Sequence, residues 1–122
     1  MMNIFTQKHL PRIWNTKESG VIEFLIYKEE DTYVGVCLTF NIVEEGSDPN
    51  EVKKQLEEAA KLHLTVVRDK RLSDELLNRH APKEYWDKYF AFQELLTTQK
   101  EVAPTDVFET LVKRYPNSFA LV

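Results

Sequence analysis

The side chains that could carry out metal or nucleophile chemistry in this chain are three histidines and one cysteine. His9, His63, His80 and Cys37 are scattered and show no ligand spacing, such as two ligands four residues apart on a helix. His63 falls on the apolar face of a predicted helix, where a hydrogen-bonded core or interface histidine is the commoner outcome. Cys37 falls within a predicted strand, where a buried thiol behaves mainly as a small apolar group. A nucleophile would also need an activating base, which the spacing does not identify. We therefore expect no metal site.

Carboxylates offer a second kind of chemistry. Glu23 on a predicted strand, with Glu57 or Glu58 on a predicted helix, could hold metal ions as in two-metal nucleases. That chemistry needs several acidic groups converging on the metals, whereas Glu57 and Glu58 follow the outward pattern of a solvated helix face. The glycines are too far apart to form a phosphate-binding loop: Gly20, Gly35 and Gly46. The residues therefore favour a protein with no catalytic residues and no cofactor, and a metal-dependent nuclease is the main enzymatic alternative.

The most aromatic segment could bind bases or protein. Tyr85, Trp86, Tyr89 and Phe90 follow one another at helical spacing. Such rings can stack on bases or anchor a protein partner, and in a small domain they also build the core. Because the chain is acidic, we favour core plus an oligomer or partner surface over base stacking.

Composition limits the class of protein. A chain of 122 residues suits one domain with one core. Its formal net charge of −4 disfavours nucleic-acid binding and suits a basic protein partner. A single cysteine rules out an internal disulfide and is typical of a reducing compartment. No segment approaches the roughly 20 apolar residues of a membrane span, so we expect a cytoplasmic protein without an anchor.

Two apolar runs with a period of two predict a β-hairpin. Alternate side chains of residues 21–27 fall on two largely apolar faces, with Ile22, Phe24 and Ile26 on one and Val21, Leu25 and Tyr27 beside Glu23 on the other. The polar residues 28–32 separate this run from residues 33–40, so they form the turn. Asn41 interrupts the second run, and a short third strand follows from Ile42 to Gly46.

Residues 48–67 predict an amphipathic helix that packs on these strands. Asp48 can cap it, Pro49 suits its first position, and Glu51 occupies the third position of a capping box. The apolar face is expected at Val52, Leu56, Ala59, His63 and Val66 or Val67. The β-branched residues of "LTVV", 64–67, leave an earlier end open.

The second half predicts two more helices. "APKEYWDKYFAFQELLTTQ" has a proline at its start and apolar residues three and four apart. "DVFETLVKRY" outlines a third helix through Val107, Phe108, Leu111, Val112 and Tyr115. The sequence thus predicts an α+β domain with an N-terminal arm (1–20), a βββα unit with a three-stranded antiparallel sheet and a long helix (21–70), and a helical extension (71–122) on the same core.

The stretch "FLIYKEEDTYVGVCLTFNIVEEGSDPNEVKKQLEEAAKLHL" resembles the N-terminal domain of HicB-like antitoxins, from about Ile22 to Leu64. In that family a hairpin carries a tyrosine or tryptophan followed by a small residue, and a third strand leads to a glycine, a polar pair and a helix with an early glutamate. The matching residues here are Tyr33, Gly35, Gly46, Ser47, Asp48, Glu51, Leu56 and Ala59.

The resemblance implies a truncated ribonuclease H-like fold without nuclease chemistry, often dimeric, that masks a small basic HicA-type mRNA-cleaving toxin. The family's strand after the helix has three candidates here: "LTVV", "RIW" near the start, and the terminal "FALV". Many members add a DNA-binding tail. Residues 72–122 match neither a ribbon-helix-helix nor a helix-turn-helix, so DNA binding is not carried over.

We therefore expect an antitoxin-like protein that binds a basic toxin through acidic residues beside the strands: Glu29, Glu30, Asp31, Glu44 and Glu45. The alternative is a stand-alone oligomerising domain of HicB-like fold with no toxin and no enzymatic activity. Its self-interface is expected at Tyr85, Trp86, Tyr89 and Phe90.

Overall fold

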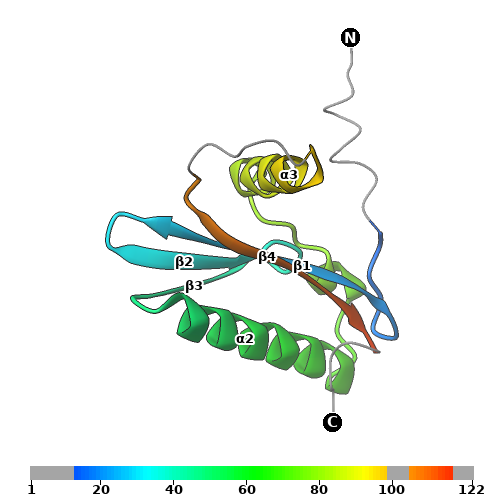
Figure 1. The fold of residues 1–122 in the computed structure, drawn as a ribbon. Coiled ribbons are helices and arrows are strands. Elements are labelled where there is room, and N and C mark those ends of the chain that lie inside the picture. Colours follow the sequence, from blue (N-terminus) through cyan, green and yellow to red (C-terminus); the bar gives the residue numbers. More distant parts are fainter. Residues whose placement is uncertain (1–12, 99–104, 117–122) are drawn as a thin grey trace.

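One antiparallel sheet carries a helix on each face (Figure 1). The structure, a computed structural model, describes residues 13–98 and 105–116. In chain order the elements are β1 (Gly20–Glu29), β2 (Thr32–Cys37), β3 (Ile42–Gly46), α2 (Pro49–Asp69), the 3₁₀ helix η1 (Asp74–Leu77), α3 (Lys83–Thr98) and β4 (Val107–Tyr115). The predicted α+β class is confirmed.

The sheet has four strands in the order β3-β2-β1-β4, and each neighbouring pair is antiparallel. The predicted hairpin is confirmed, because Glu29 pairs with Thr32 and leaves Glu30 and Asp31 as a two-residue turn. Glu30 has a φ of 57°, a left-handed conformation that such tight turns require. The three predicted strands are present, but the prediction of a three-stranded sheet was wrong.

The fourth strand, β4, is formed by residues that the apolar spacing predicted to be a helix. It pairs with β1 along most of its length, from Tyr115 opposite Gly20 to Val107 opposite Tyr27. Leu111 and Tyr115 are four residues apart, and positions four apart share a face in a strand as well as in a helix. β-Branched and aromatic side chains favour the strand. The backbone of β4 also forms hydrogen bonds with the amide and carbonyl groups on the side of β1 that faces away from β2. The helix prediction for this segment was therefore wrong.

The three candidate segments for a fourth strand do not supply it within the described residues. "LTVV" lies inside α2, Ile13 and Trp14 of "RIW" have no regular structure, and "FALV" lies outside the described residues. Among its described residues, the predicted helical extension is helical only in η1 and α3, because β4 returns to the sheet.

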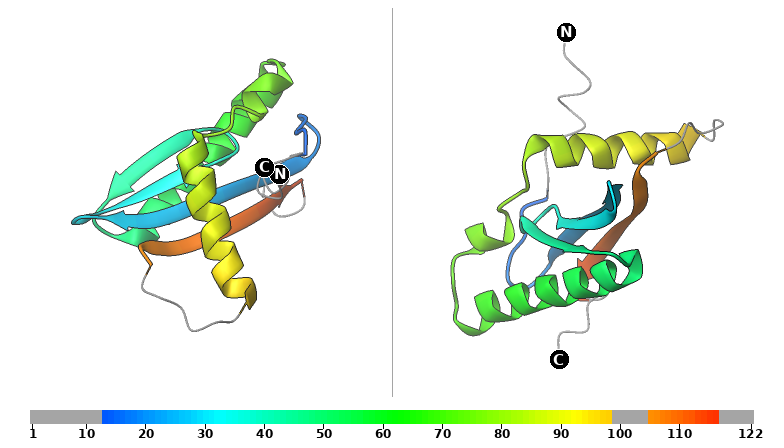
Figure 2. Two further views of the ribbon diagram at one scale, coloured as in Figure 1. Left: turned by 90° about the horizontal axis from the view of Figure 1, so that it is seen from above. Right: turned by 90° about the vertical axis from the view of Figure 1, so that its left-hand side faces the viewer.

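The two helices cover opposite faces of the sheet, so the fold has three layers (Figure 2). We name these faces the α2 face and the α3 face. Strand β1 lies in the middle and is buried on both: Phe24 contributes to the core on the α2 face and Leu25 to the core on the α3 face. This confirms the prediction that both faces of this strand are apolar.

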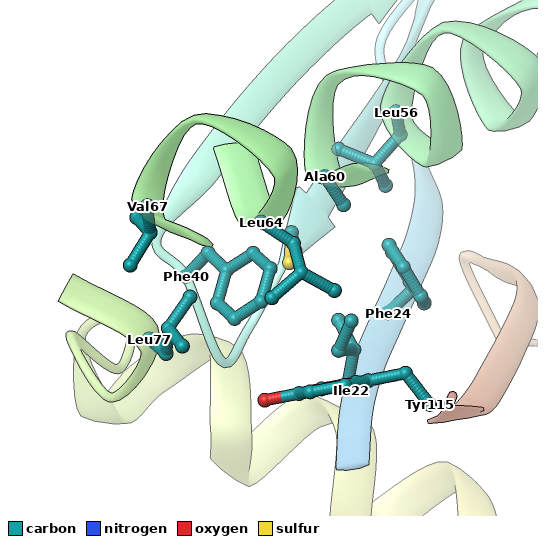
Figure 3. Close-up of a cluster of buried hydrophobic side chains, with 10 residues drawn as sticks. Ile22, Phe24, Phe40, Leu56, Ala60, Leu64, Val67, Leu77 and Tyr115 are labelled. Atoms are coloured by element: carbon teal, nitrogen blue, oxygen red, sulfur yellow. The ribbon is translucent and has the colours of Figure 1, made fainter. Parts of the chain in front are cut away.

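The core on the α2 face joins helix, sheet and η1 (Figure 3). Phe24, Leu56 and Leu64 are fully buried there, and Leu77 closes the far end. The complete cluster is Ile22, Phe24, Cys37, Phe40, Leu56, Ala60, Leu64, Val67, Leu77 and Tyr115. The core on the α3 face consists of Leu25, Tyr27, Val34, Val36, Leu38, Ala81, Trp86, Tyr89 and Val107.

Helix α2 begins as predicted. The Asp48 carboxylate accepts a hydrogen bond from the Asn50 amide at 2.9 Å, and Pro49 is the first helical residue. The helix continues through "LTVV" to Asp69, because this segment supplies the buried Leu64 and Val67. The expected apolar face was one residue off in the middle, since Ala60 and Leu64 are buried where Ala59 and His63 had been predicted.

Strand β2 and helix α2 approach closely at Gly35. A Cβ atom there would lie 2.7 Å from Val52 Cγ1 and 3.1 Å from Leu56 Cδ2. Such a contact is too short for an unchanged helix position. The small residue that follows the hairpin tyrosine therefore sets how closely α2 packs on the sheet.

Asn15 ties the segment before β1 to η1. Its side chain is fully buried, donates to the carbonyls of Val21 and Leu77 at 3.0 and 3.1 Å, and accepts from the Val21 amide at 2.9 Å. Asn78 completes the pair, because its side chain bonds both the amide and the carbonyl of Asn15 at 2.9 Å. The last residues of the predicted arm 1–20 are thus part of the packed structure, whereas residues 1–12 lie outside the described part.

Candidate partner-binding surface

The predicted acidic residues lie near one end of the sheet. Glu29, Glu30 and Asp31 are exposed at the β1–β2 turn, because a two-residue turn leaves its side chains in water. The end of β3, the start of α2 and the start of β4 lie at the same end, on the left of Figure 1. We call this region the hairpin-end surface, and its exposed acidic residues are Glu29, Glu30, Asp31, Glu45, Asp48 and Asp106.

The two glutamates of β3 are separated by the sheet. Glu45 pairs with Val34, lies on the α3 face and is exposed. Glu44 pairs with Gly35, lies on the α2 face and is half-buried. The strand therefore presents one carboxylate on each side of its outer edge, close to the turn but not as a single patch.

An aromatic pair lies at the same end of the sheet, near Glu30 and Asp106. The rings of Tyr33 and Phe108 meet edge to face, with their centroids 6.0 Å apart and an interplanar angle of 72°. Phe108 is 41% exposed. The pair borders a shallow hollow of about 310 Å³ that is lined by Lys28, Glu30, Tyr33, Thr105, Asp106, Val107 and Phe108.

Sequence reasoning missed three residues of this surface. Asp48 was interpreted only as a helix cap, although its side chain is also exposed at this end. Asp106 and Phe108 were placed in a helix that does not exist. The β-branched and aromatic residues of "VFETLVKRY" are a strand signal that could have placed Phe108 in the sheet.

The four rings predicted for an oligomer interface pack mainly inside the chain. Trp86 is 6% exposed and Tyr89 1%, and both belong to the core on the α3 face. Tyr85 and Phe90 are half-buried, and the ring of Phe90 stacks on Trp86 with centroids 5.8 Å apart. The core role predicted for this segment is confirmed, and the self-interface stays a prediction.

The carboxylates considered for nuclease chemistry are not brought together. Glu23 lies on the α3 face, where it accepts a hydrogen bond from the Tyr89 hydroxyl at 3.0 Å. Glu57 lies on α2, across the sheet, and forms an ion pair with Lys113 of β4 at 3.5 Å. Glu58 is exposed on the outer side of α2. These positions do not allow Glu23 and the α2 glutamates to share a metal ion.

The histidines of the described part serve packing. His63 Nε2 lies 2.7 Å from the Leu76 carbonyl, and its ring lies against Phe40 with centroids 4.8 Å apart. The ring of His80 packs near Trp86. His9 lies outside the described residues. Within residues 13–98 and 105–116, no three histidine, cysteine, aspartate or glutamate side chains are grouped closely enough to hold a metal ion.

Cys37 is fully buried beneath α2, and burial raises the pKa of its thiol to about 12. A thiol that stays protonated reacts slowly, because the thiolate is the nucleophile. We expect a disulfide reagent to label the native protein at least about 100-fold more slowly than the urea-unfolded chain, since labelling requires opening of the core. Absorbance at the release of the reagent's thiolate gives the rate, and Cys37 is the only cysteine. Fast labelling in native buffer would contradict the packing of α2 over this strand.

Comparisons of the chain with protein-family models, curated proteins and solved structures find no match. The resemblance to HicB-like antitoxins therefore rests on the residues of the hairpin and helix alone. Among the described residues, no helix has the length and apolar character needed to cross a membrane.

Proposed function

We propose that this protein is antitoxin-like and binds and occludes a small basic mRNA-cleaving toxin. The observation that carries the proposal is the hairpin-end surface, where exposed carboxylates of the β1–β2 turn, β3 and the start of α2 lie at the same end of the sheet as the partly exposed ring pair of Tyr33 and Phe108. The residues of the HicB resemblance lie in the elements that build this surface, including Tyr33, Gly46 and Asp48.

Charge gives this surface its expected partner. A ribonuclease that cleaves mRNA must attract phosphates, so its active face carries lysine or arginine. A group of carboxylates attracts the same face, speeds encounter and competes with RNA for it. Inhibition by occlusion then needs no chemistry from the antitoxin.

The aromatic pair gives the surface an anchor. Binding energy at protein interfaces is concentrated in a few aromatic and arginine side chains, whereas exposed charges at the rim mainly set the association rate. Phe108 and Tyr33 are the aromatic residues that border the hollow at this end. We therefore assign affinity to these rings and steering to the carboxylates.

The steering role predicts the effect of reversing the turn charges. In the triple variant Glu29→Lys, Glu30→Lys, Asp31→Lys, we expect the association rate with a small basic protein that co-purifies with this chain to fall at least about tenfold at low salt. Stopped-flow fluorescence at 20 mM and 300 mM salt measures the association rate of each protein. The difference in rate between wild type and variant should shrink about tenfold at the higher salt, because ions screen the charges.

The control has the same net charge with the changes made elsewhere. Glu58→Lys, Asp69→Lys and Glu84→Lys alter exposed residues of α2, the end of α2 and α3. This variant should keep most of the wild-type association rate. Equal rates for wild type, turn variant and control would exclude the hairpin-end surface as the binding surface.

A further inference from the structure

The outer edge of β3 is open in the described part of the chain. β3 is the first strand in the order β3-β2-β1-β4, so one side of its backbone has no strand partner there. Amide and carbonyl groups at such an edge pair readily with an extended segment from another molecule. Natural edge strands are often protected by charged side chains, by proline or by a covering element, and both charges of "IVEEG" are acidic, so they disfavour an acidic added strand but not a basic one.

The opposite edge of the sheet is better protected. Helix α3 crosses the sheet over β4, and its last turns lie beyond that strand (Figure 2). Two ion pairs also link β4 to α2: Lys53 with Glu109 at 3.2 Å and Glu57 with Lys113 at 3.5 Å. Helix α2 packs on one face of β3, but in the described part of the chain no element lies beyond the outer edge of β3, so an added strand can reach this edge more easily than that of β4 (Figure 2).

Charge argues against a second copy of this chain at that edge. An antiparallel pair of β3 strands centred on Glu44 or Glu45 would place that glutamate opposite its own copy, and a pair centred on Val43 would place Glu44 opposite Ile42, with no cation opposite either glutamate. Like charges directly opposite each other destabilise a strand pair. A basic segment would instead place each cation opposite a carboxylate.

The alternation along β3 gives the pattern of the partner. Glu45 and the half-exposed Val43 lie on the α3 face, and Glu44 and Ile42 lie on the α2 face. Residues directly opposite each other in a strand pair lie on the same face. In an added strand that runs antiparallel to β3, two neighbouring basic residues would therefore meet Glu45 and Glu44, and the two aliphatic residues after them would meet Val43 and Ile42.

We propose that the outer edge of β3 binds an extended segment of a basic protein by strand addition, with two basic residues followed by two aliphatic residues facing Glu45, Glu44, Val43 and Ile42. This inference rests on the proposed function, since it states how the basic toxin docks. It places strand addition beside the hairpin-end surface, so that the charges of the turn and the backbone of β3 act on the same partner.

The test uses the full chain and a synthetic peptide, acetyl-Gly-Thr-Lys-Lys-Val-Val-Thr-amide, as the probe. We expect saturable chemical-shift changes at β3 amides and slower hydrogen exchange there, by about fivefold or more at saturation. The decisive control is the same peptide with alternate amides N-methylated, which keeps its charge but cannot form one side of a strand ladder. Its affinity should be at least about tenfold lower. Equal affinity of the two peptides would overturn the proposal.

A variant completes the test. The double variant Glu44→Lys, Glu45→Lys should bind the unmethylated peptide at least about tenfold more weakly than the wild type does. The matched double variant Glu58→Lys, Asp69→Lys should bind it with wild-type affinity. The affinities of the same two double variants for a basic protein that co-purifies with the chain separate this inference from the proposed function. If the β3 variant binds that protein as tightly as the control does, the edge is not its docking site and the toxin-binding function stands. If the peptide binds as expected but no basic protein is ever recovered, the edge stands and the proposed function fails.

Discussion

Phe24→Ala is expected to lower the free energy of unfolding by about 3–5 kcal/mol, the range for a buried phenylalanine that leaves a cavity. Phe24 is fully buried between the sheet and α2, in the core cluster to which β2, α2, η1 and β4 also contribute residues. Loss of its ring therefore leaves a cavity within this cluster. Urea unfolding followed by tryptophan fluorescence, to which the buried Trp86 and the exposed Trp14 both contribute, measures the change.

Two further variants make this result interpretable. Phe108→Ala removes the same ring from a position that is 41% exposed, so its cost should stay below about 1 kcal/mol. Phe24→Leu keeps most of the volume and should cost less than about 1.5 kcal/mol, which gives a measurable protein if the alanine variant does not fold. Similar costs for Phe24→Ala and Phe108→Ala would show that α2 does not pack on the sheet as described.

The second large effect is expected at Asn15. Asn15→Ala should cost about 2–4 kcal/mol, because the Val21 amide and the carbonyls of Val21 and Leu77 lose the side chain that satisfies them. Asn15→Asp should be at least as damaging at pH 7, because its carboxylate would face two carbonyl oxygens in a buried site. Lowering the pH to about 4 should recover part of that loss as the carboxyl group is protonated.

Asn50→Ala serves as the control for Asn15, because its side chain is exposed on the first turn of α2. Its effect should stay within about 0.5 kcal/mol. If thermal or urea unfolding gave the same stability for both alanine variants, the segment before β1 would not be tied to η1.

Local signals account for what could be predicted from the sequence. The turn at Glu30 and the cap at Asp48 each depend on a few neighbouring residues, and both were found. The apolar face of α2 was misplaced because Ala59-Ala60 and His63-Leu64 offer two nearly equivalent choices one residue apart. Only the position of the sheet relative to the helix decides between them.

Long-range pairing accounts for what was missed. Leu111 and Tyr115 fit a helix face and a strand face equally well, and the choice is made by β1, which lies far away in the chain. Because β4 was predicted as a helix, the contact between Tyr33 and Phe108 could not be anticipated. Glu29, Glu30, Asp31 and Glu45 of the candidate site were named from the sequence, since they lie in the predicted turn and third strand, whereas Asp106 and the aromatic part depend on the fourth strand.

Native mass spectrometry is the most direct test of the proposed function. The chain would carry a tag, be expressed together with its native flanking genes, and be purified without denaturation. A complex of this chain with a small, basic protein whose RNA cleavage is blocked in the complex and restored on its release is the predicted result. Species that contain only copies of this chain, although the flanking genes are expressed, would contradict toxin binding.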